Sequence, residues 1–112
     1  MTDRLKGDQF VSDAPKIDED FFDRADSFIH LANEHIQSQG PAKIGAAFLF
    51  AASRFNAWNC ARSFSSGELM KEARTEALDS FTSQFRAMLE DNYDDYVANF
   101  GRFIKGETVD PG

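Results

Sequence analysis

One segment of the chain, residues 44–61, is apolar on almost every side. A helical turn of about 100° per residue divides its apolar side chains between two opposite faces. The first face holds Ile44, Ala47, Phe48, Ala51, Phe55 and Trp58, and the second holds Leu49, Phe50, Ala57 and Cys60. A helix that is apolar on two faces needs other elements packed against both. We therefore expect a helical domain organised around this segment.

Two long amphipathic helices flank this segment, because their apolar residues recur at three- and four-residue spacing. The first begins at Asp18, which suits the N-cap, and ends at Gly40, with Pro41 opening the next helix. The other runs from about residue 68 to 91, and Ser65 and Glu68 have capping-box spacing at its start. Short connections of this kind place consecutive helices antiparallel.

A last, shorter helix is predicted from roughly residue 93 to 104, with a corner at Asp91 or Asn92. Strand periodicity is absent from the sequence. The predicted fold class is all-α, a compact antiparallel helical bundle of three long helices plus one short C-terminal helix. This single domain spans residues 18–104, and tails at 1–17 and 105–112 flank it.

The charge of the chain restricts its partners. A net charge of -7, with 12 scattered basic residues, disfavours nucleic acid and anionic membranes. Arg54, Asn56 and Asn59 interrupt the apolar segment before it reaches the length of a membrane span. With one cysteine, Cys60, and no apolar leader, we expect a cytoplasmic protein with a reduced structural thiol. Folding at this length needs no cofactor, so none is expected.

The best metal-ligand spacing is formed by Asp26, His30 and Glu34, which share one side of the first helix. That side lies opposite the apolar stripe, which favours a solvated face over a metal site. Motifs for a nucleophilic serine, a phosphate loop or a calcium loop are missing from the sequence. We therefore predict neither a metal site nor catalytic residues.

The candidate ligand-binding residues are polar groups that interrupt apolar helices or gather in the acidic stretch 90–96. A guanidinium near a core needs a carboxylate or carbonyl partner, and the acidic stretch offers carboxylates. One interpretation is structural, with Arg54 joining its helix to that stretch, and the other is recognition of an anionic ligand or a partner chain. The candidates are Arg54, Asn56, Asn59, Asp94 and Asp95.

Three segments, residues 21–33, 51–57 and 88–100, together resemble a family of small bacterial proteins catalogued as domain of unknown function 3144. Their order and spacing carry the resemblance, which covers roughly residues 18–104. It implies a compact helical bacterial protein. The resemblance implies no activity and assigns no site residue.

Two functions of different classes fit the sequence. The favoured one is a non-enzymatic interaction module, because the many Phe residues exceed what four short elements can cover, and a symmetric homodimer is the commonest arrangement. The alternative is a small-molecule or metal-binding protein, conceivably an enzyme, with its site near Arg54 and the acidic stretch. The first requires an exposed apolar face or a large interface. The second requires its candidate side chains to converge.

Overall fold

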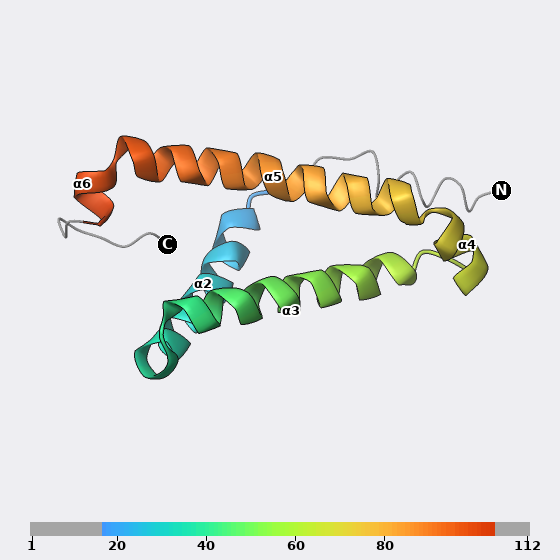
Figure 1. Ribbon diagram of the computed structural model, residues 1–112, viewed down its shortest axis with the longest axis horizontal. Helices are drawn as coiled ribbons and strands as arrows, with labels where there is room; N and C mark the ends of the chain where they lie inside the picture. Colours follow the sequence, from blue (N-terminus) through green and yellow to red (C-terminus); the bar gives the residue numbers. More distant parts are fainter. Residues whose placement is uncertain (1–16, 105–112) are drawn as a thin grey trace.

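The computed structural model describes residues 17–104, so the predicted tails lie almost entirely outside the described residues. This part of the chain is helical and contains no strand. Two long helices, α3 (Pro41–Ala61) and α5 (Arg74–Ala98), run in opposite directions and are joined at one end through the short α4 (Gly67–Glu72) (Figure 1). The preceding helix α2 (Phe21–Gln39) crosses this pair, and α6 (Phe100–Phe103) closes the described chain. The all-α class is confirmed.

Helix α2 begins two residues later than the sequence predicts. Its N-cap position is Asp20, and Asp18 instead accepts the Phe21 N–H through its backbone carbonyl. The Asp18 carboxylate pairs with the Arg24 guanidinium at 2.7 Å. This hydrogen bond holds the pKa of Asp18 below its usual value. The prediction of an Asp18 cap was wrong, because the carboxylate binds a side chain one turn inside the helix.

The α2–α3 connection follows the sequence prediction closely. Gly40 ends α2 with φ +88°, a backbone conformation that side chains with a Cβ rarely adopt, and its N–H bonds to the Ile36 carbonyl. Pro41 opens α3, where its missing N–H costs nothing. The two helices contact one another from this turn.

The segment after α3 contains one more break than predicted. Ser66, not Ser65, caps α4, and its hydroxyl accepts the Leu69 N–H at 3.1 Å. Helix α4 then ends at Ala73, a buried small residue between α4 and α5. The predicted single helix from about 68 is therefore divided in two.

The predicted corner at Asp91 or Asn92 was wrong, because α5 continues through both residues to Ala98. Asn92 donates a hydrogen bond to the Met88 carbonyl, within the helix. The chain turns at Asn99, and α6 folds back so that the Tyr96 and Phe103 rings lie 4.8 Å apart between centroids.

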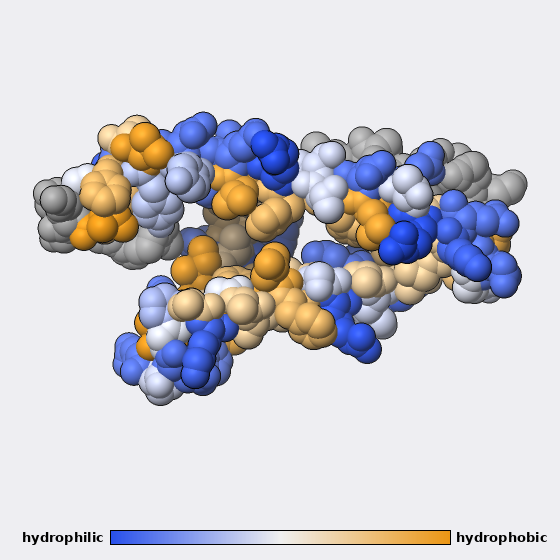
Figure 2. Space-filling view, in the orientation of Figure 1, coloured by the Kyte–Doolittle hydropathy of each residue, from blue (hydrophilic) through white to orange (hydrophobic). Residues whose placement is uncertain are grey.

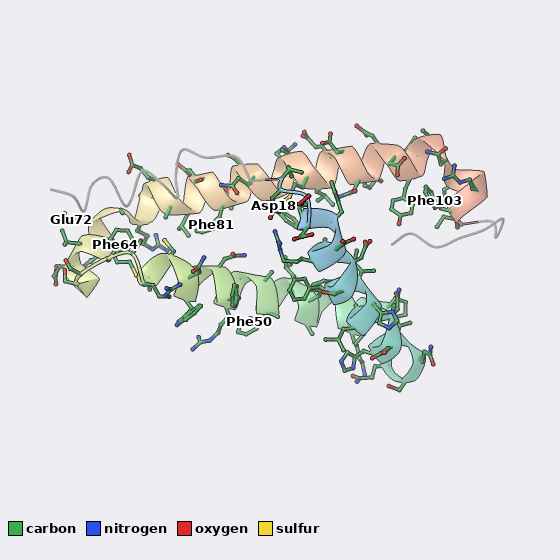
Figure 3. All side chains as sticks on the ribbon, turned by 180° about the vertical axis from the view of Figure 1, so that it is seen from behind. Asp18, Phe50, Phe64, Glu72, Phe81 and Phe103 are labelled. Atoms are coloured by element: carbon green, nitrogen blue, oxygen red, sulfur yellow. The ribbon has the colours of Figure 1, made fainter. Side chains whose placement is uncertain are left out.

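The hydrophobic core is small. Cys60, Ala73 and Ser80 are the buried residues within 17–104, and they belong to the end of the molecule where α3, α4 and α5 meet. Phe64 lies in the turn at the same end, and Phe81 lies on α5 (Figure 3). The segment expected to be enclosed, α3, is exposed along most of its length. The antiparallel bundle predicted from the sequence is not confirmed for the single chain.

Candidate functional site

The most distinctive surface of α3 is apolar. Five large side chains beyond its first turn are between 40 and 65 % exposed. We call this set the α3 face, although it wraps around the helix: Phe48, Leu49, Phe50, Phe55 and Trp58. Seven of the other positions of α3 are alanines, whose short side chains cover little of this surface. Side chains of this size normally belong to a core or an interface.

A second apolar surface follows the C-terminal half of α5. Five large side chains there are between 40 and 67 % exposed, and we call them the α5 face: Phe85, Met88, Leu89, Tyr93 and Val97. The N-terminal half of α5 is better covered, because Ala77, Ser80 and Phe81 are buried or half-buried near the α4 corner. Hydrophobic side chains line the sides of α3 and α5 that face each other, with open space between the helices toward α6 (Figure 2).

The polar candidates on α3 make local contacts. The Asn56 amide donates to the Ala52 carbonyl of the same helix at 2.9 Å. The Asn59 carbonyl oxygen accepts a hydrogen bond from Arg62 at 3.1 Å. Arg54 lies exposed on the same helix, and no hydrogen bond or ion pair joins it to another residue of 17–104. These three side chains therefore do not gather around one point.

The acidic candidates lie on α5, far along the chain from Arg54. Asp95 accepts a hydrogen bond from the Asn99 amide at 2.9 Å, and Glu90 pairs with Arg86 at 3.1 Å. Asp94 is exposed on the same stretch of helix. The acidic residues thus lie on the surface of one continuous helix, not at a corner between two helices. The ligand-binding hypothesis for these side chains stays a prediction from the sequence.

The metal-like spacing on α2 produces a surface contact. His30 Nε2 lies 3.3 Å from Glu34 Oε2, and both side chains are mostly exposed. Within residues 17–104 no group of three or more His, Cys, Asp or Glu side chains is placed to hold a metal ion.

The single thiol lies at the α3–α4 corner. Cys60 is 3 % exposed, and burial raises the pKa of its thiol. A protonated, enclosed thiol is a poor nucleophile, which agrees with the structural role expected from the sequence.

The sequence predicted that other elements would pack against both faces of α3, whereas the structure leaves α3 largely exposed. A helical period alone cannot separate a core stripe from an open interface. The signal that pointed correctly was the apolar character of α3 on both sides. One chain with three long helices has too few elements to cover it.

The sequence comparison places this architecture in a family. The family model described as Protein of unknown function (DUF3144) matches residues 21–97, which run from the start of α2 to the end of the α5 face. The chain belongs to this family. The resemblance seen in the three sequence segments is confirmed, and both apolar faces lie within the matched region of the DUF3144 domain.

No curated protein and no solved structure matches this DUF3144 chain. Along residues 17–104, none of the helices combines the length and the apolar character that crossing a bilayer requires.

Proposed function

We propose that this DUF3144 protein is a non-enzymatic interaction module that binds another polypeptide through the α3 face and the α5 face. The observation that carries the proposal is the contrast between these faces and the core. Ten large apolar side chains on two long helices stand open to solvent, whereas Cys60 and Ala73 are the buried apolar residues of 17–104.

The energetic cost of leaving these faces in water supports the proposal. Covering half of one large side chain removes about 100 Å² from solvent. At about 25 cal/mol per Å², this stabilises the covered state by about 2.5 kcal/mol for each side chain. Folded proteins are stable by only about 5–15 kcal/mol, so a few such contacts decide whether the helices hold their arrangement.

The chemistry of the surface favours a protein partner. Large aromatic and Met side chains are the residues enriched at protein interfaces. The chain also carries a net charge of -7, which opposes nucleic acid and anionic lipid. A polypeptide that presents its own apolar helix side is the partner that fits both properties.

The test combines Phe55→Glu on the α3 face and Phe85→Glu on the α5 face with a matched control, Phe28→Glu. Phe28 is 60 % exposed on α2, outside both faces. Purified wild type and variants are compared by native mass spectrometry and by binding of an apolar fluorescent dye. If the faces are covered by association, the first two variants lower the assembled mass. If the faces are free, wild type binds the dye and the same two variants reduce that binding.

Phe28→Glu is expected to behave as wild type in both measurements. A monomer that binds no dye and whose mass, dye binding and stability are unchanged by Phe55→Glu and Phe85→Glu would contradict the proposed function. That result would mean that the two faces are already covered within one chain.

A further inference from the structure

The two helices that present the apolar faces carry opposite net charge. Helix α3 contains two basic residues, Lys43 and Arg54, and no acidic residue. Helix α5 contains six acidic and two basic residues, and four of the acidic ones lie in the uncovered stretch 90–95. Opposite charge around two apolar surfaces is typical of surfaces that bind each other.

The charges also lie at comparable positions around their helices. Arg54 precedes Trp58 of the α3 face by one turn, so it flanks that face. Asp91 follows Met88 of the α5 face by three residues, and Asp95 lies one further turn along. Flanking charges of this kind select partners and register where two helices pack.

These charges cannot meet within one chain. Arg54 lies about 10 Å from the end of α3 at the α4 corner, at 1.5 Å per residue. Asp91 and Asp95 lie about 26–32 Å from the start of α5 at the same corner. Because the two helices leave this corner side by side, about 15 Å along the helix axes separates Arg54 from Asp91, and about 21 Å separates it from Asp95. No ion pair between Arg54 and either carboxylate is present in residues 17–104.

We propose that the occupant of both faces is a second copy of this chain. In a two-fold symmetric dimer the α3 face of each copy packs on the α5 face of the other, and Arg54 lies opposite Asp91 and Asp95 of the second copy. Symmetry forms each contact twice. The dimer also completes the antiparallel helical bundle that one chain leaves open. This inference rests on the proposed function, and it adds the identity of the partner and the pairing of the helices.

The exposed area agrees with such a dimer. The ten side chains of the two faces are about half exposed, so they offer roughly 1,000 Å² per chain. Two copies would bury roughly 2,000 Å², the size at which obligate homodimer interfaces begin. The residues 1–16 of the same chain are a weaker occupant, because Met1, Leu5, Phe10 and Val11 are their only large apolar side chains.

A charge exchange between copies tests this pairing. One variant carries Arg54→Asp, and the other carries Asp91→Arg with Asp95→Arg. Each variant alone places like charges at both contacts and should dimerise at least about tenfold more weakly than wild type. When the two variants are mixed, one contact of the heterodimer regains the original charges and the other has them exchanged. The heterodimer should therefore form at least about tenfold more tightly than either homodimer, as read by native mass spectrometry.

Three control variants change residues that belong to neither face. Lys71→Glu on α4 and Asp23→Arg with Asp26→Arg on α2 make matched charge changes and should dimerise as wild type. Phe10→Asp tests residues 1–16 and should also leave the dimer unchanged. Helix content by circular dichroism confirms that each variant remains folded.

Each other outcome overturns the inference in a different way. A heterodimer no tighter than the homodimers would exclude the pairing of Arg54 with Asp91 and Asp95. A dye-binding monomer would exclude the second copy but leave the proposed function standing, since the faces would await another protein. Loss of the dimer in Phe10→Asp would show that residues 1–16 hold the two copies together, which would overturn the direct pairing of the two faces. A monomer that binds no dye would overturn both proposals.

Discussion

The Phe55 and Trp58 rings lie 5.5 Å apart between centroids on the surface of α3, and they are 61 and 54 % exposed. The Arg62 guanidinium lies 5.2 Å from the Trp58 ring. Aromatic pairs at roughly 4.5–7 Å between centroids stabilise a structure by about 0.5–1.5 kcal/mol beyond the area that they bury. The pair therefore belongs to a surface that is preformed in the single chain, where we propose that another chain binds.

Replacing Gly40 with alanine is expected to destabilise the protein. A φ of +88° and a ψ of 151° place Gly40 in a region that only glycine adopts readily, so Gly40→Ala should cost about 1–3 kcal/mol of unfolding free energy. Gly45→Ala is the matched control, because Gly45 lies within α3 and a Cβ there meets no atom within 4 Å. That variant should stabilise the protein by about 0.5–1 kcal/mol. Urea denaturation at equal chain concentration compares them, and effects of the same sign would contradict this account.

Two neighbouring serines distinguish the observed cap of α4 from the predicted one. Ser66 Oγ accepts the Leu69 N–H, so Ser66→Ala should lower the unfolding free energy by about 1 kcal/mol. Ser65→Ala should change it by less than about 0.5 kcal/mol, since Ser65 is exposed and outside the helix. Thermal unfolding of the two variants measures both changes in unfolding free energy. A larger decrease in Ser65→Ala than in Ser66→Ala would support the capping box predicted from the sequence and contradict the Ser66 cap.

Cys60 should make stability fall at alkaline pH. Burial raises the pKa of this thiol in the folded protein above its value in the unfolded chain. The unfolded chain then loses the thiol proton first, so the contribution is complete below the unfolded pKa and is lost as pH rises through the folded pKa. Urea midpoints measured from neutral to alkaline pH should fall less steeply in Cys60→Ala than in wild type. If the urea midpoints of wild type and Cys60→Ala fall equally with pH, the Cys60 thiol is not buried in the folded protein.

The α6 turn should depend on one ring contact. Phe103 is half-buried against Tyr96, whereas Phe100 is exposed on the same short helix. Phe103→Ala should speed amide hydrogen exchange at residues 100–104 and lower the unfolding free energy by about 1 kcal/mol. Phe100→Ala should leave both quantities close to wild type. Equal exchange rates in the two variants would mean that the Tyr96 contact does not hold α6.

Local structure was the part of this fold that the sequence predicted best. The pair Gly40 and Pro41 marked the α2–α3 turn, because each residue restricts the backbone in a way that suits only that position. The break at Ala73 and the continuity of α5 through Asp91 and Asn92 were missed. Alanine is a strong helix former, so propensity argued against a break there, and the lower helix propensity of Asp and Asn is too small to end a long helix.

For the candidate site, the sequence identified the charged residues but not the distances between them. Arg54 was recognised as a cation that needs a partner, and the acidic stretch was recognised as a source of carboxylates. Their separation along antiparallel helices could not be read from spacing, because it depends on how α4 turns the chain. A pattern of apolar residues also does not say whether the covering element belongs to the same chain or to another.

The most direct test of the central claim uses Trp58, the one tryptophan of the chain. Its side chain is 54 % exposed in the single chain and belongs to the α3 face. Its fluorescence emission and its quenching by acrylamide are measured as the protein is diluted, with the mass followed in parallel. We predict a shielded, blue-shifted Trp58 at high concentration that becomes exposed as the dimer dissociates. A monomer whose Trp58 is equally shielded at every concentration would contradict the claim that the apolar faces are covered by another chain.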